Sequence, residues 1–94
     1  MRSKGEKKIA DFLTKHRIKW SYESHPLFLD GWICVPDFYL PKYKLHIEYY
    51  GGHPKSLKKK IIKNKLYKKH KINMLTLRPF ELKDLKKYLL GKLK

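Results

Sequence analysis

The pattern of apolar positions predicts a helix at the start of the chain and strands after it. Apolar residues near the N-terminus recur every three or four positions, which is typical of one face of a helix, here ending near Arg17. From Lys19 to Glu23 apolar and polar residues alternate instead, which predicts a strand. Farther on, Asp30-Gly31 separates two short apolar runs. We therefore expect a tight hairpin turn there and interpret Asp30 as a turn residue.

The stretch from Pro36 to Tyr50 predicts two short strands joined by a turn at Lys42-Tyr43. If the strands pair symmetrically about that turn, Asp37 falls directly opposite Glu48, with the two Cβ atoms roughly 5 Å apart. Like charges in that relation destabilise a sheet. Two carboxylates placed in this way are usually explained by a divalent cation between them.

A lysine-rich helix is predicted to follow, from Lys55 to Lys71, with a narrow apolar stripe that includes Ile61 and Ile62. No acidic residue occurs between Tyr49 and Phe80. A solvated helix usually carries glutamates among its lysines. Because this helix has none, we expect phosphates to supply the negative charge. The residues that we expect to contact nucleic acid are Lys55, Lys58, Lys59, Lys60, Tyr67 and Arg78.

Two more elements complete the chain. Residues Ile72 to Leu77 are mostly apolar and predict a buried strand, and Phe80 to Leu93 predict a last amphipathic helix. The order that we expect for the core is helix, three strands, helix, strand, helix. We therefore expect a single domain, residues 1–94, of the α/β (α+β) class, in which helices flank a central mixed sheet.

Composition narrows the range of partners. Lysine and arginine number 24 against 8 acidic residues, a net charge of +16, which implies a polyanion: DNA, or alternatively RNA. A membrane surface is disfavoured because no long amphipathic helix of interfacial type occurs. The alternative is that the lysine enrichment reflects only a thermophilic or AT-rich origin and indicates no particular partner. The single cysteine and the absence of a secretory signal predict a cytoplasmic protein, and the scattered histidines do not predict structural zinc.

The chain resembles the PD-(D/E)xK nuclease superfamily in the order of three features: Pro36-Asp37, a hairpin, and Glu48 within an apolar strand. The resemblance covers nearly the whole chain and implies the restriction-endonuclease-like fold and a Mg²⁺- or Mn²⁺-dependent endonuclease. It implies that Asp37 and Glu48 bind the metal, together with the carbonyl of the residue after Glu48. Glu6, which follows Ser3 in a capping-box spacing, matches a third acidic ligand of many relatives; a purely capping role is the alternative.

Tyr50 stands where the family has its catalytic lysine. Small relatives carry a lysine in the following helix instead, which implies Lys63 here, with Lys44 as second choice. Tyr50 itself could orient the attacking water, or catalysis could be lost. An ion pair of the buried acids with one of these lysines would explain them without a metal. His53 matches a family histidine loosely, which implies a contact to a DNA phosphate or a water; the alternative is an ordinary loop residue.

The resemblance thus predicts a DNA endonuclease of repair or recombination. With little chain left for base-reading loops, we expect it to recognise backbone or DNA structure, such as a nick, branch or junction. Similar small nucleases act as homodimers, which is the expectation here. Two alternatives remain: a catalytically inactive nucleic-acid-binding protein of the same fold, and a basic ribosome-associated or RNA-binding protein that makes no use of the carboxylates.

Overall fold

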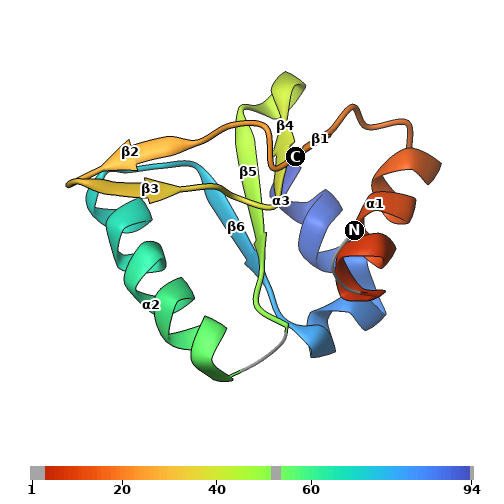
Figure 1. Ribbon diagram of the computed structural model, residues 1–94. Helices are drawn as coiled ribbons and strands as arrows, with labels where there is room; N and C mark the ends of the chain where they lie inside the picture. The colour runs from red at the N-terminus through yellow and green to blue at the C-terminus, as the bar shows by residue number, and fades with distance from the viewer. Residues whose placement is uncertain (1–3, 52–53, 94) are drawn as a thin grey trace.

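The computed structural model describes residues 4–51 and 54–93 and, within those ranges, all side chains except those of residues 54–57. Helices lie on both sides of a mixed sheet, so the predicted α+β class is confirmed (Figure 1). The elements in chain order are α1 (Lys4–Lys15), β1 (Ser21–Tyr22), β2 (Leu27–Leu29), β3 (Trp32–Cys34), β4 (Phe38–Leu40), a 3₁₀ turn (Pro41–Tyr43), β5 (Leu45–Tyr49), α2 (Pro54–Lys69), β6 (Met74–Leu77), a 3₁₀ segment (Pro79–Asp84), a π-helical segment (Lys86–Leu90) and α3 (Gly91–Leu93).

The four strands of the sheet lie in the order β1-β4-β5-β6. β4 is antiparallel to both β1 and β5, whereas β6 runs parallel to β5. A parallel neighbour requires a crossover, and α2 provides it. The β2–β3 hairpin is inserted between β1 and β4 along the chain and forms a separate two-stranded sheet.

The β4–β5 pair has the register that the sequence predicted. Phe38 lies opposite Ile47, and Leu40 lies opposite Leu45. The connection is a 3₁₀ turn that ends at Lys44, whose φ of 49° is left-handed. Continuing this register by one residue beyond β4 places Asp37 opposite Glu48, at the end of the pair that is remote from the turn.

One face of the sheet forms the main core with α1 and the C-terminal helical segment. The buried side of α1, which includes Ile9 and Leu13, packs with Phe38 and Ile47 of the sheet. Each such side chain stabilises the fold by about 1.5–3 kcal/mol when it is fully buried. Glu6 lies on the same buried side of α1.

The opposite face is covered by α2, in a rotation that the apolar stripe did not predict. Ile61 and Ile62 are exposed, whereas Lys60 and Lys63 are half-buried and Tyr67 is buried. The predicted inward stripe is therefore wrong at its isoleucines. The reason is that this face of the sheet carries carboxylates, so the helix turns donor groups toward them.

The β2–β3 hairpin is held against α2 by its inner side. Leu29 and Cys34 form a small second core with Tyr67. The turn is the predicted one: Asp30 and Gly31 both have positive φ, 50° and 81°. Asp30 is more than a turn residue, because its carboxylate accepts from Lys69 Nζ at 2.6 Å and lies 3.0 Å from His70 Nε2.

The last predicted helix is helical in most of its length but irregular. A 3₁₀ segment and a π-helical segment precede α3, and Leu85 and Leu89 are buried, in keeping with an amphipathic segment. The strand before it, β6, is shorter than predicted and lies at one edge of the sheet, mostly half-buried. Among the residues that the structure describes, no helix has both the length and the apolar character needed to cross a membrane.

Two glycines make room for the Tyr49 ring, and one of them gives a stability test. A Cβ on Gly5 or on Gly51 would overlap that ring. We expect Gly5→Ala to lower the free energy of unfolding by about 1–3 kcal/mol because the buried ring must shift. Gly91→Ala is the matched control: its added Cβ meets no described atom within 4 Å, so helix propensity should raise stability by roughly 0.5–1 kcal/mol. Urea unfolding of both variants checks this; equal stabilities would contradict it.

Candidate active site

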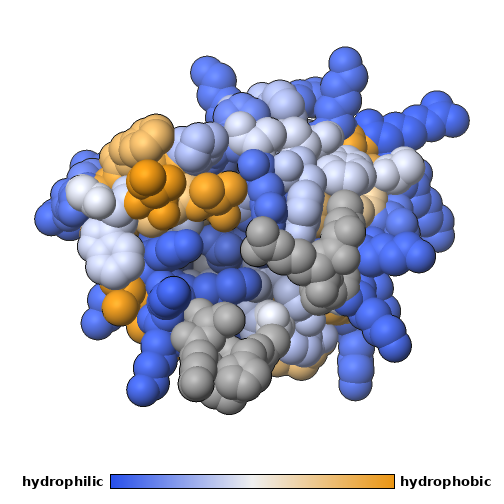
Figure 2. Space-filling model, in the orientation of Figure 1, coloured by the Kyte–Doolittle hydropathy of each residue, from blue (hydrophilic) through white to orange (hydrophobic). Residues whose placement is uncertain are grey.

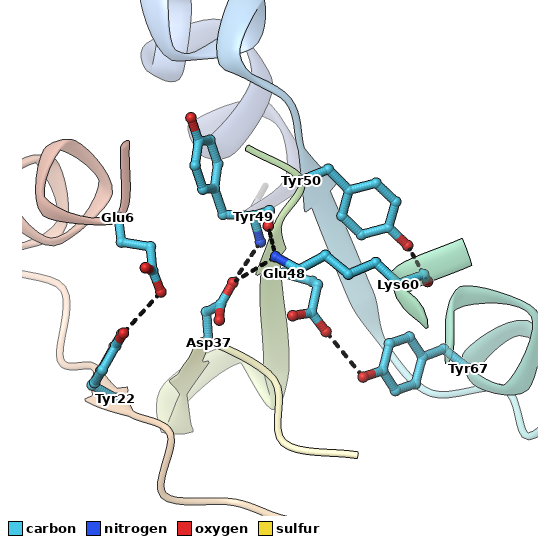
Figure 3. Close-up of polar contacts among 8 residues, drawn as sticks. All are labelled: Glu6, Tyr22, Asp37, Glu48, Tyr49, Tyr50, Lys60 and Tyr67. Carbon is cyan, nitrogen blue, oxygen red and sulfur yellow. Dashed lines mark hydrogen bonds and ion pairs between the residues drawn. The ribbon is translucent and has the colours of Figure 1, made fainter. Parts of the chain in front are cut away.

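Asp37 stands at the start of β4 as the centre of a polar cluster (Figure 3). Its Oδ2 accepts a hydrogen bond from the Tyr49 backbone N–H at 2.7 Å and lies 3.9 Å from Lys60 Nζ. Burial raises the pKa of Asp37 to about 6, although the Tyr49 amide and the Lys60 charge act in the opposite direction. The carboxyl is therefore held near the pH at which it can gain or lose a proton.

Glu48 is the second buried acid, and it projects from β5 toward α2 (Figure 3). Its Oε2 accepts a hydrogen bond from the Tyr67 hydroxyl at 3.0 Å. Burial and, next in size, the charge of Asp37 together raise the pKa of Glu48 to about 7, against the opposing charges of Lys60 and Lys63. The two carboxyls thus interact electrostatically, as their predicted positions in the hairpin require.

Glu6 brings a third carboxylate from α1, and Glu23 brings a fourth. Glu6 Oε2 accepts a hydrogen bond from the Tyr22 hydroxyl at 2.9 Å. One ligand oxygen each from Glu6, Glu23 and Asp37 lie within 4.8 Å of one another. Tyr22 pairs with Phe38, and Glu23 and Asp37 lie side by side just beyond these paired strands, where the Glu23 N–H donates to the Asp37 carbonyl at 3.0 Å.

Lys60 supplies the positive charge of the cluster. Its ammonium donates to the Tyr49 carbonyl oxygen and approaches Asp37 (Figure 3). The Tyr50 hydroxyl donates to the Lys60 carbonyl at 2.7 Å, which fixes that turn of α2 against the end of β5. Burial raises the pKa of Tyr50 to about 12, so this hydroxyl keeps its proton. The Tyr50 side chain therefore fixes the backbone at Lys60, and its hydroxyl proton is already hydrogen-bonded to that carbonyl oxygen.

The other predicted lysines lie elsewhere. Lys63 is half-buried and close enough to Glu48 to lower the pKa of that carboxyl, but its influence is smaller than that of Lys60. Lys44 is exposed at the opposite end of β5 from Glu48. Sequence reasoning had given Lys60 to phosphate binding and Lys63 to catalysis, whereas the structure places Lys60 at the carboxylates.

Apart from Lys60, which lies at the carboxylates, the predicted nucleic-acid contacts divide into three groups. Lys58, Lys59 and Arg78 are exposed, as phosphate contacts must be. Tyr67 is a correction: its ring is buried and its hydroxyl is bonded to Glu48, so it is not a surface contact. The predictions for His53 and Ser3, and for the Lys55 side chain, lie outside the described part of the chain.

Sequence reasoning missed Glu23 and the role of Lys60. The pairing of β1 with β4 would have revealed Glu23, but β1 has only two residues and its partner is separated from it by a whole hairpin. Lys60 and Tyr67 are seven residues apart and so share one helix face. Pairing that helix face with the buried acids, instead of searching for an apolar stripe, would have predicted that Lys60 and Tyr67 point inward.

The carboxylate oxygens of Glu6, Glu23 and Asp37 are of the kind that hard divalent cations prefer, and their spacing decides which ion fits without movement. Carboxylate oxygens are the ligands that Mg²⁺ and Mn²⁺ prefer. Oxygens on opposite sides of Mg²⁺ are about 4.2 Å apart, and around Ca²⁺ they are about 4.6–5.2 Å apart. The oxygens of Glu6, Glu23 and Asp37 lie within 4.8 Å of one another, so they are compatible with the larger ion as they stand and with Mg²⁺ after a small movement. Acidic side chains also gather in this way in proteins without a bound ion.

The raised pKa values predict a stability that falls with pH when no divalent cation is added. Between the usual value of 4.5 and about 7, folded Glu48 holds a proton that the unfolded chain releases, and Asp37 behaves likewise from 3.8 to about 6. The folded state then binds more protons, so its stability decreases as pH rises through this window and levels off above it.

We expect Glu48→Gln to flatten this decrease, because the amide keeps an acceptor for Tyr67 without the buried charge. Melting temperatures of the parent and variant at about pH 5 and about pH 8 provide the measurement. Histidine titration is common to both proteins and cancels in the difference. Parallel pH profiles for the two proteins would contradict the raised pKa of Glu48.

Comparison with protein-family models, with curated proteins and with solved structures found no match.

Proposed function

We propose that this chain is a metal-dependent endonuclease that hydrolyses phosphodiester bonds in DNA, with a restriction-endonuclease-like fold. The observation that carries the proposal is the gathering of Glu6, Asp37, Glu48 and the Lys60 ammonium at one end of the β4–β5 pair. Such a concentration of buried acids in a chain of net charge +16 costs folding free energy. A catalytic task accounts for that cost, and perturbed pKa values are typical of such sites.

The topology supports the same proposal. The order α1, an antiparallel β1-β4-β5 sheet, a crossover helix and a parallel β6 agrees with the fold that the sequence resemblance implies. The acids come from α1, the start of β4 and the end of β5, which are the elements that carry the matched motif positions. The β2–β3 hairpin is an addition to that order.

Asp37, with Glu6 and either Glu23 or Glu48, would hold a Mg²⁺ or Mn²⁺ ion. When bound, such an ion neutralises phosphate oxygens and lowers the pKa of its water. The chain's own residues then have distinct tasks. Tyr67 orients Glu48 through its hydroxyl, and the Tyr49 amide fixes the Oδ2 atom of Asp37. Lys60 offers an ammonium to the phosphate or the attacking water, as the missing motif lysine would.

A second candidate function, a nuclease-fold protein that binds nucleic acid without cutting it, is favoured by one contact. The Lys60 ammonium sits on the Tyr49 carbonyl, the very oxygen that the family resemblance assigns to the metal. A lysine there can replace the ion as the counter-charge of Asp37. Its long flexible stem also allows it to move away when an ion or a phosphate arrives.

Incubation of the purified protein with linear, nicked and branched DNA and with RNA, each with Mg²⁺, Mn²⁺ or EDTA, tests the proposal. We expect metal-dependent cleavage of DNA and none with EDTA. Calorimetric titration with Ca²⁺ separates the two candidates further, since a permanently lysine-neutralised site binds no ion. Tight nucleic-acid binding without cleavage under any condition would favour the inactive binding protein.

A further inference from the structure

An apolar patch on the outer side of the β2–β3 hairpin is not used by the candidate active site. Phe28 and Ile33 face each other across the hairpin and are 74% and 62% exposed, and the neighbouring Trp32 is 44% exposed. Figure 2 shows apolar side chains gathered together beside strongly hydrophilic surface, over the part of the molecule where Figure 1 places this hairpin. Exposed aromatic and branched side chains in one patch mark an interaction surface.

The hairpin is a firmly mounted element. Its two-residue turn carries the positive φ values that match the twist of paired strands. Lys69 and His70 of the α2 end hold Asp30, and the inner side packs on Tyr67. Tyr67 in turn donates to Glu48. The apolar patch is therefore connected to the carboxylates through a single buried tyrosine.

Charge decides which partner fits this patch. The hairpin's one acid, Asp30, is already neutralised by Lys69, and the other exposed lysines of adjacent α2 include Lys65 and Lys68. A second copy of the chain would bring the same positive surface and be repelled, whereas a nucleic acid brings phosphates. Bases offer flat apolar faces next to those phosphates, but intact duplex keeps the faces stacked and hidden. Only unstacked bases are available to the patch.

We infer that the β2–β3 hairpin is a base-stacking wedge, in which Phe28, Trp32 and Ile33 contact unstacked bases at a nick, branch or single-strand junction while the lysines of α2 hold the flanking phosphates. The inference rests on the proposed function, because it assigns the substrate class of that site. Apolar side chains that insert at base steps are a general means of engaging distorted DNA. The wedge would bring the distorted position to the carboxylates.

Binding measured in EDTA tests the wedge independently of cleavage. Fluorescence anisotropy compares affinity for an intact duplex with that for the same duplex carrying a nick or an unpaired flap. Replacing both Phe28 and Ile33 by serine should reduce affinity for the nicked and flapped DNA by about 5- to 150-fold, the value of one lost base stack, and leave intact duplex affinity unchanged. Phe80→Ser is the matched control, since Phe80 is 61% exposed outside the hairpin.

A second measurement needs no change in the hairpin. In a Trp20→Phe variant the only tryptophan is Trp32, and stacking on bases should quench its fluorescence with flapped DNA but not with intact duplex. The reciprocal Trp32→Phe protein keeps the half-buried Trp20 and should show no such quenching.

Unchanged discrimination in the Phe28/Ile33 variant, or absence of Trp32 quenching, would overturn the inference. So would a parent dimer that sedimentation shows to become monomeric in that variant while its preference for nicked DNA persists, since the occupant is then a second copy. The two proposals fail separately: a parent protein that cleaves DNA but shows no preference for nicked or flapped DNA removes the wedge alone. If the parent protein prefers nicked or flapped DNA but cleaves no DNA with any metal ion, the wedge stands and the nuclease proposal fails.

Discussion

Asp37→Asn should reduce metal-dependent cleavage by at least about 100-fold, the usual loss when one electrostatic partner of a reaction is removed. The substitution removes the charge of a carboxylate that lies beside Glu6 and Glu23 and 3.9 Å from Lys60 Nζ. The amide oxygen can still accept the hydrogen bond from the Tyr49 N–H, so the fold should persist. Because burial raises the pKa of Asp37, the neutral amide should also leave stability equal or higher near neutral pH.

Initial rates on a labelled DNA substrate, together with a melting curve, measure both parts of this expectation. Asp84→Asn is the matched control, because Asp84 is an exposed acid that caps the Lys87 backbone N–H at 3.3 Å, in the C-terminal helical segment. Full cleavage by Asp37→Asn would remove the carboxylates from the mechanism and favour a basic RNA-binding or ribosome-associated protein that uses charge alone.

The second large effect separates two lysines that are one helical turn apart. We expect Lys60→Met to lower cleavage by about 100-fold or more and Lys63→Met to lower it by less than about tenfold. Methionine keeps a long apolar stem at either position, so both variants should fold. The reason for the difference is geometric: Lys60 reaches Asp37 and the Tyr49 carbonyl, whereas Lys63 acts on Glu48 only through its field.

Ca²⁺ affinity in the same two variants gives an independent readout. If the Lys60 ammonium competes with the ion, Lys60→Met should bind Ca²⁺ more tightly than the parent, because the anionic cluster has lost its internal cation. A larger loss of cleavage in Lys63→Met than in Lys60→Met would reverse the assignment. It would show that α2 turns its other lysine to the site when substrate binds.

Local patterns predicted the central hairpin because its register depends on nearby residues alone. A symmetric pairing about the turn was enough to bring Asp37 beside Glu48, and the mixed sheet with flanking helices followed from the order of periodicities. The pairing of β1 with β4 could not be derived in this way. Two residues carry almost no alternation signal, and the inserted hairpin separates the partners along the chain.

The orientation of α2 shows where the apolar-stripe rule fails. Ile61 and Ile62 should lie inward on a purely apolar sheet. Here the sheet face presents Glu48 and the edge presents Asp37, and an unpaired buried charge is far more costly than two exposed isoleucines. Donor residues Lys60 and Tyr67 therefore take the inward positions. The inward face of α2 can therefore be predicted only when the side chains on the facing side of the sheet are known as well.

The position of β6 at the rim of the sheet has a practical consequence. Its outer backbone groups are those of an edge strand, which is a template for pairing with other chains. In free protein the mutual repulsion of molecules of net charge +16 opposes such contacts. Polyanions cancel that repulsion, so turbidity should be greatest where added DNA just balances the protein's charge. Purified material is best freed of nucleic acid in high salt, which weakens phosphate contacts, and then returned to low salt, where the repulsion is least screened, before it is concentrated.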